Sequence, residues 1–137
     1  IVPWLGRMQE AGYGVIARMP LQFGLLTGKF DPGARFGPDD HRHFRLPPPL
    51  LERTLQALEP AWPLAKKYGT TKAGLALSFI LAFPEVSTVI PGIKTAEQAV
   101  LNTRHLVRLE AADRKWLQQL YQEQLAEGLM PELERAG

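Results

Sequence analysis

Two glycine-containing segments hold the residues best suited to bind a phosphate group. One spans residues 15–29 (VIARMPLQFGLLTGK) and the other residues 89–102 (VIPGIKTAEQAVLN). Gly24 and Gly92 have no side chain, so the backbone can approach a ligand closely at these positions. Lys94 adds a full positive charge just before a predicted helix. These residue types suit a ligand that carries phosphate, and simple turns at Gly24 and Gly28 are an equally good alternative.

Thr95 and Gln98 have the spacing of a capping box, in which both side chains bond to free N–H groups at the start of a helix. They predict a helix that reaches about Arg104. The free N–H groups and the positive end of the helix dipole at such a start attract anions. Capping alone explains both residues, and a surface position alone explains Lys94. An anion site is therefore a hypothesis that needs further support.

The elements that would position these segments alternate between strand and helix. Residues 15–19 predict a short buried strand, and residues 86–90 are a second β-rich run that predicts another strand. Residues 21–48 are rich in Gly and Pro and predict a long loop of the kind that is often functional. Apolar spacing predicts helices at residues 50–65 and 72–83, with a break or kink in the first at Pro60 and Pro63. Strands separated by helices indicate an α/β fold with parallel strands.

Helices are also predicted at residues 3–11 and 110–125, while residues 126–137 show no clear pattern. Trp62 and Trp116 lie on apolar helix faces and are predicted to be core residues. Two strands cannot form a sheet that is covered on both faces. The length of 137 residues is also well below the roughly 250 of a complete (β/α)8 barrel. We therefore expect this chain, which does not begin with Met, to be part of something larger.

The two glycine-containing segments resemble the strand-seven and strand-eight motifs of the aldo-keto reductases, in the same order. Residues 68–77 (YGTTKAGLAL) resemble the helix that lies between these motifs in that family, and the resemblance runs from about residue 10 to residue 125. It implies an α/β fold in which residues 1–137 form the carboxy-terminal portion of a (β/α)8 TIM barrel, with residues 126–137 as an uncertain tail. It also implies that the chain binds NADP, as NADPH, for an oxidoreductase that reduces aldehydes or ketones.

The resemblance assigns cofactor contacts to both segments by motif position. The first segment should border the pyrophosphate and its ribose, with residues 25–29 folding over the cofactor. In the second, Lys94 should hold the 2′-phosphate with the help of Gln98, and Asn102 should reach the adenine edge. The assigned residues are Pro20, Leu21, Gln22, Gly24, Leu25, Lys29, Ile90, Pro91, Gly92, Lys94, Gln98 and Asn102.

Three positions depart from the family motifs. Met19 stands where the family mostly has Ser, which loses a hydroxyl group, and Arg18 replaces a common Tyr. Leu101 stands where a Glu usually precedes the Asn, which removes a contact to adenine. We therefore expect the affinity for the dinucleotide, or the preference for NADPH over NADH, to differ from that of the family.

No catalytic residue is assigned. The family's Tyr acid and its Asp, Lys and His partners belong to the amino-terminal half of the barrel, and none of Tyr13, Tyr68 and Tyr121 stands in that motif. Protonation of a carbonyl oxygen needs a positioned acid. We therefore expect the small-molecule carbonyl substrate to bind in the complete barrel, with pairing to a missing amino-terminal half or self-association as the open alternatives. The rival hypothesis is a non-catalytic truncated barrel that binds a nucleotide or a partner protein.

Composition argues against several classes of partner and of binding site. The net charge is only +2 and the basic residues are spread along the chain, which argues against nucleic acid as a partner. The absence of Cys excludes disulfides and thiolate metal sites and is consistent with a cytoplasmic setting. Residues 73–83, the longest apolar stretch, are fewer than the roughly 20 that span a membrane, so no membrane partner is expected. His41 and His43 alone are more typical of a surface loop than of a metal site.

Overall fold

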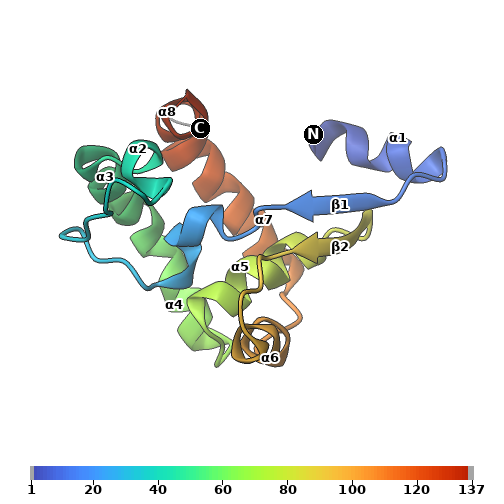
Figure 1. Ribbon diagram of the computed structural model, residues 1–137. Coiled ribbons are helices and arrows are strands. Elements are labelled where there is room, and N and C mark those ends of the chain that lie inside the picture. The colour runs from blue at the N-terminus through green and yellow to red at the C-terminus, as the bar shows by residue number, and fades with distance from the viewer. Residues whose placement is uncertain (1, 136–137) are drawn as a thin grey trace.

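The computed structural model describes residues 2–135, which form two short strands and a larger body of helices (Figure 1). No helix in this part of the chain is long and apolar enough to cross a membrane. In chain order the elements are η1 (Val2–Trp4), α1 (Leu5–Glu10), β1 (Val15–Arg18), η2 (Gln22–Thr27), α2 (Arg42–Arg45), α3 (Pro48–Leu58), η3 (Glu59–Ala61), α4 (Trp62–Lys67), α5 (Lys72–Leu81), β2 (Val86–Ile90), α6 (Ala96–Arg104), α7 (Ala111–Leu120), the π-helical η4 (Tyr121–Ala126) and α8 (Leu129–Arg135).

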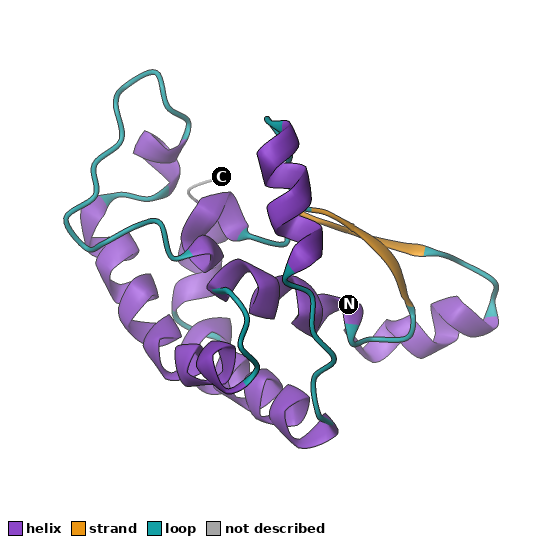
Figure 2. Cartoon of the chain, turned by 90° about the horizontal axis from the view of Figure 1, so that it is seen from below, coloured by secondary structure: helices purple, strands orange, loops and turns teal. Residues whose placement is uncertain are grey.

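The two strands form a parallel pair. Ile16 of β1 lies opposite Thr88 of β2, and Arg18 lies opposite Ile90. The carboxyl ends of both strands therefore meet at one edge, where the chain enters the loops of the two glycine-containing segments. Figure 2 shows the pair at one side of a body that is otherwise helical. The predicted α/β class with parallel strands is confirmed, and the arrangement is consistent with part of a (β/α)8 barrel.

Proline and threonine residues set several helix boundaries. α3 has Pro48 at its first position, where the missing N–H leaves no hydrogen bond unmade. Pro60 and Pro63 divide the helical path that follows into the turn η3 and the short helix α4. α5 begins after Thr71, whose Oγ1 accepts a hydrogen bond from the N–H of Gly74 at 2.9 Å. α5 then packs against β2 and supports the strand pair from below in Figure 1.

A leucine-rich core joins η2, α3 and α8. Leu25 of η2, Leu46 and Leu51 belong to this cluster, and none of them is more than 2% exposed. α8 adds Leu129 and Leu133, each 7% exposed. The tail that had no prediction from sequence thus contains a helix that helps to close the core, up to the last described residue of the chain.

The structure corrects three sequence predictions. Val15 of β1 is 9% exposed but Ile16 is 58% exposed, because successive side chains of a strand point to opposite faces and only one face is packed. Trp116, predicted as a core residue, is 39% exposed, whereas Trp62 packs against the leucine cluster. The loop predicted over residues 21–48 is interrupted by η2 and α2, whose turns need only a few residues each.

Candidate functional site

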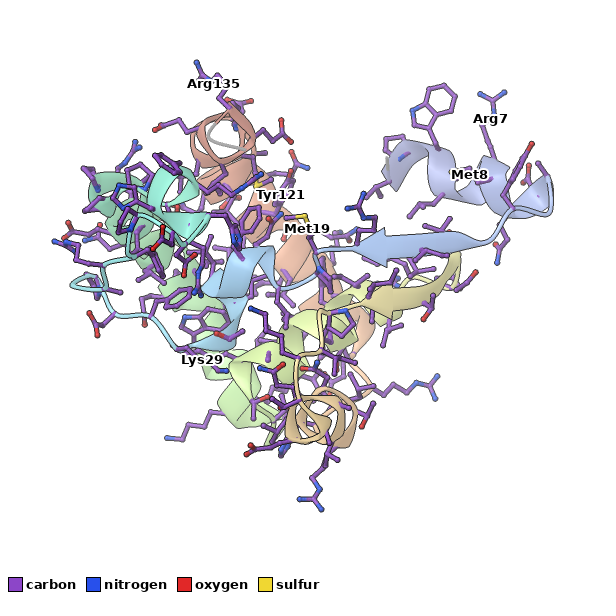
Figure 3. The ribbon with its side chains drawn as sticks, in the orientation of Figure 1. Arg7, Met8, Met19, Lys29, Tyr121 and Arg135 are labelled. Carbon is purple, nitrogen blue, oxygen red and sulfur yellow. The ribbon has the colours of Figure 1, made fainter. Side chains whose placement is uncertain are left out.

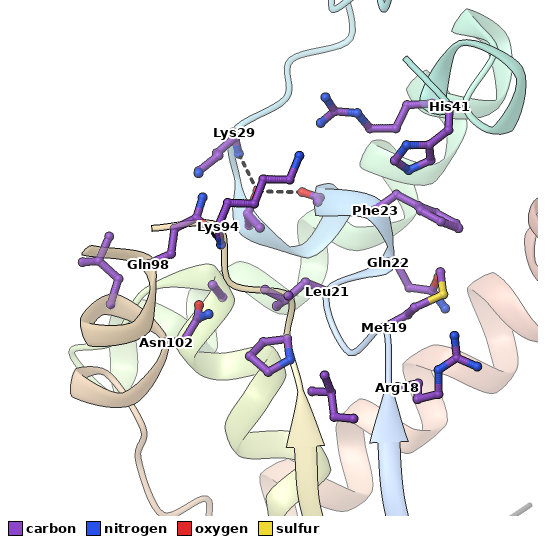
Figure 4. A pocket seen from close by; sticks show the side chains of 18 of the residues that line it. Arg18, Met19, Leu21, Gln22, Phe23, Lys29, His41, Lys94, Gln98 and Asn102 are labelled. Carbon is purple, nitrogen blue, oxygen red and sulfur yellow. Dashed lines mark hydrogen bonds between the residues drawn. The ribbon is translucent and has the colours of Figure 1, made fainter. Parts of the chain in front are cut away.

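A pocket of about 1060 Å³ opens where the carboxyl ends of β1 and β2 meet. Figure 4 shows the residues of η2 on one side of it and those of α6 on the other. Its size is at the upper end of the roughly 300–1,000 Å³ typical of ligand sites. Most of the predicted cofactor residues line it, namely Leu21, Gln22, Gly24, Lys29, Ile90, Pro91, Gly92, Lys94, Gln98 and Asn102. The other two, Pro20 and Leu25, are buried beneath the surface, Leu25 within the leucine core.

The segment that follows β1 has an unusual backbone conformation. Met19, which Figure 3 shows directly after the strand, has a φ of 52°, and Gln22 and Phe23 have φ values of 44° and 55°. These values lie in the left-handed region that residues with a side chain rarely adopt. Gly24 follows with a φ of 101°. Such strain persists only where the surrounding structure enforces it, and it is concentrated at ligand sites. Nothing in the sequence indicated it.

Thr27 closes this turn. Its hydroxyl donates to the carbonyl oxygen of Gly24 at 2.6 Å and accepts from the N–H of Lys29 at 3.3 Å, as the dashed lines in Figure 4 show. Both Thr27 and Lys29 line the pocket. The side chain of Thr27 therefore holds the glycine turn and the following lysine in one local arrangement, a role that the sequence analysis did not assign.

The opposite wall is the start of α6. Thr95 accepts a hydrogen bond from the N–H of Gln98 at 3.2 Å, so the predicted cap is confirmed. The second half of the capping box differs from expectation, because Oε1 of Gln98 accepts from the N–H of Lys94 at 2.7 Å rather than from that of Thr95. The side chain of Gln98 thus holds the backbone of Lys94 in place. Asn102 lies one turn further along the same side of α6 in Figure 4.

A second part of the long loop also lines the pocket, which the sequence did not predict. Asp39, Asp40, His41 and Arg42 all contribute to this wall. Arg42 Nε donates to both carboxylate oxygens of Asp40, at 2.9 and 3.1 Å, and this guanidinium holds the pKa of the Asp40 carboxyl well below its usual range. The ring of His41 meets that of Phe23 edge-on, with centroids 5.6 Å apart.

The charged side chains of the pocket favour an anionic ligand. The cationic lining residues are Arg18, Lys29, Arg42 and Lys94, and the acidic ones are Asp39 and Asp40. Arg42 and Asp40 neutralise each other, so three cations remain against one carboxylate. Within residues 2–135, Lys94 forms no ion pair. Its charge is therefore free to act on a ligand at the start of α6.

The end of α6 is fixed against α5. Thr70 Oγ1 donates to the backbone oxygen of His105 at 2.5 Å, and His105 lines the pocket. A Cβ atom at Gly74 would lie 2.5 Å from the same oxygen, so α5 approaches this point as closely as a glycine allows. The orientation of α6, and with it the positions of Gln98 and Asn102, thus depends on α5.

A Tyr, a Lys and an Asp meet at the start of α7. Tyr68 OH donates to Asp113 Oδ2 at 2.5 Å and accepts from the N–H of Glu110 at 2.9 Å, and Lys67 Nζ lies 2.6 Å from Asp113 Oδ2. Burial, and then the hydrogen bond to Asp113, raises the pKa of Tyr68. None of these residues is part of the pocket lining. The group therefore serves to hold the first turn of α7.

Comparison with known proteins identifies the family. The Aldo/keto reductase family model matches residues 5–122. The L-glyceraldehyde 3-phosphate reductase of Escherichia coli O157:H7 is 35% identical over 113 residues, which cover 77% of this chain and 32% of that protein. The putative voltage-gated potassium channel subunit beta of Schizosaccharomyces pombe is 34% identical over 101 residues, 70% of this chain and 29% of that protein.

A third relative, the probable voltage-gated potassium channel subunit beta of Oryza sativa subsp. japonica, is 31% identical over 100 residues, 69% of this chain and 30% of that protein. The chain spans about a third of the length of the curated relatives it matches. The matched region contains both walls of the pocket and the helix between them. This chain belongs to the aldo/keto reductase family.

Proposed function

We propose that this chain is the NADPH-binding portion of an oxidoreductase that reduces aldehydes or ketones. One observation carries the proposal: the strained turn at Gly24 and the capped start of α6 meet in one pocket with an excess of positive charge. Membership of the family, and a relative that is named as a reductase, support the same activity.

The residues around the pocket suit the parts of NADPH. Gly24 gives the backbone close access to a pyrophosphate, and Lys29 supplies charge on the same side. Lys94 stands beside the free N–H groups of α6, the arrangement that best holds a further phosphate. The amide of Asn102 offers both a donor and an acceptor to an adenine edge. When bound, the dinucleotide would supply a hydride, while the residues of this chain hold and orient it.

The proposal places β1 and β2 as strands seven and eight of a (β/α)8 barrel. Their parallel register supports this, as does a pocket at the carboxyl ends of the strands, where ligands bind in such barrels. The acid that protonates the carbonyl oxygen would then belong to another part of the barrel, because none of the tyrosines of this chain lines the pocket. The carbonyl substrate would bind between the two parts.

Lys94→Glu tests the proposal in the full-length protein. A lost charge-assisted hydrogen bond is worth about 1.5–3 kcal/mol, so the affinity for NADPH should fall about 10- to 100-fold. The affinity for NADH, which lacks the 2′-phosphate, should change much less. Both are measured by titration of cofactor fluorescence. Lys115→Glu, an exposed lysine on α7, is the control and should change neither affinity. Equal losses for both dinucleotides would contradict 2′-phosphate recognition, and no binding to the unmodified protein would contradict the function itself.

A second candidate is a nucleotide-binding subunit without turnover. It is supported by relatives that are named as potassium channel beta subunits. An assay of NADPH oxidation with a reactive aldehyde separates the two candidates. Steady turnover by the full-length protein supports the reductase, and saturable NADPH binding without turnover supports the subunit.

A further inference from the structure

Arg42 makes several of the contacts that hold the long loop between η2 and α2. Its Nε donates to both oxygens of Asp40, at 2.9 and 3.1 Å, and its terminal nitrogen forms an ion pair with the same carboxylate. The N–H of Arg42 donates to Asp40 Oδ1 at 2.9 Å. Side chain and backbone therefore fix the short turn that leads into α2, on the wall of the pocket.

The same guanidinium also reaches back to the beginning of the loop. It lies over the ring of Phe36, 4.7 Å from the centroid, and over that of Phe30, 5.5 Å from the centroid. The two rings meet edge-on with centroids 5.1 Å apart. A cation over an aromatic face is attracted by the ring electrons, and each such contact stabilises the arrangement. Arg42 thus joins Phe30, Phe36 and Asp40 into one unit, which we call the arginine clamp.

Phe30 of the arginine clamp packs against the glycine turn of the pocket. A Cβ atom at Gly24 would lie 3.0 Å from two ring atoms of Phe30, so this ring packs directly against the Gly24 backbone. Gly24 has a φ of 101° and lies between the left-handed Phe23 and Thr27, which bonds to its carbonyl oxygen. The ring of Phe30 therefore blocks the turn from relaxing towards the loop.

We propose that Arg42 is a positioning residue for dinucleotide binding, acting through Phe30 on the Gly24 turn. This inference rests on the proposed function, because it assumes that the turn borders the pyrophosphate. Since the charge of Arg42 is paired with Asp40, its role differs from that of Lys94. Arg42 sets the shape of a surface that NADPH and NADH share, whereas Lys94 recognises a group that only NADPH has.

Four variants of the full-length protein test this role. Arg42→Ala should weaken NADPH and NADH binding by the same factor, about tenfold, a change that corresponds to the loss of contacts of this kind. Phe30→Leu should have a similar effect. The double variant should bind the dinucleotides no more weakly than either single variant, because both changes remove the same packing of Phe30 against Gly24. Arg42→Lys keeps the charge but not the planar fork, and should bind little better than Arg42→Ala.

Arg53→Ala is the matched control. Arg53 also pairs with a carboxylate, that of Glu132, but it lies outside the pocket lining, so its loss should leave both affinities unchanged. Additive effects of Arg42→Ala and Phe30→Leu would overturn the inference. A selective loss of NADPH binding in Arg42→Ala, rescued by Arg42→Lys, would also overturn it and would indicate a direct phosphate contact instead. If the unmodified protein binds neither dinucleotide, that result contradicts the proposed function itself, whatever the variants of Arg42 show.

Discussion

At Gly74, α5 packs closely against His105 at the end of α6, and Gly74→Ala tests that contact. The added Cβ atom would lie 2.5 Å from the carbonyl oxygen of His105 and closer still to the hydroxyl of Thr70. Neither neighbour moves freely, because Thr70 donates a hydrogen bond to that same carbonyl and His105 belongs to the backbone beside the pocket. The methyl group therefore has to displace α5 or the chain that follows α6.

Opposing effects decide whether Gly74→Ala raises or lowers the free energy of unfolding. Ala is favoured over Gly by about 1 kcal/mol in the interior of a helix, and this sets an upper bound for Gly74, which lies in the first turn of α5. Packing an extra methyl group into a fixed site costs about 1–3 kcal/mol, and loss of the Thr70–His105 hydrogen bond costs about 1 kcal/mol more. We therefore expect the free energy of unfolding to fall by about 1–3 kcal/mol. Because α6 carries Gln98 and Asn102, NADPH affinity should fall as well.

Equilibrium unfolding in urea, followed by circular dichroism, measures the first effect. Gly6→Ala is the matched control: Gly6 also lies in a helix, α1, and an added Cβ would meet nothing within 4 Å. That variant should be as stable as the unmodified protein or more stable by up to about 1 kcal/mol. Unchanged stability and NADPH affinity in Gly74→Ala would refute the argument that α5 fixes the position of α6.

Two further predictions concern stability away from the pocket. Leu133→Ala should lower the free energy of unfolding by about 2–4 kcal/mol because Leu133 is 7% exposed in the leucine core; a loss as small as that of the exposed control Glu134→Ala, in the same urea assay, would show that α8 is not part of the core. Hydrogen bonds from Lys67 and Tyr68 hold the pKa of Asp113 below its ordinary value of 3.8, so its ionised form stabilises the fold above about pH 4, and this contribution is lost as the pH falls through the lowered pKa. The difference in stability between the unmodified protein and Asp113→Asn should therefore shrink below about pH 4, and a difference that is constant with pH would contradict the assignment.

Features that depend on residues close together in the chain were predicted correctly from the sequence. The helix after Thr95 was predicted from a threonine and a glutamine three positions apart, and the hydrogen bond between them is present. The break at Pro60 and Pro63 followed from the missing N–H groups alone. The two segments that line most of the pocket were recognised because their glycines, prolines and Lys94 stand in local motifs that do not depend on the rest of the fold.

Contacts between distant segments were not predictable in this way. Arg42 and Phe30 stand in a Gly- and Pro-rich stretch whose pattern indicates only a loop, yet they join its two ends. Leu129 and Leu133 follow no long periodic run, and their burial depends on a neighbouring helix, α3. The exposure of Ile16 likewise depends on which face of the strand pair is covered. In each case the deciding fact is what the rest of the chain places beside the residue.

Gln98 shows why the two proposed roles at the start of α6 belong together. Its spacing from Thr95 predicted a capping box, and its place in the motif implied support for Lys94. The N–H groups of Lys94 and Thr95 are one residue apart, so sequence alone could not separate these roles. In the structure Oε1 of Gln98 accepts from the N–H of Lys94. The bond that completes the helix start therefore also fixes the backbone of the lysine, which sets where its free charge meets the pocket.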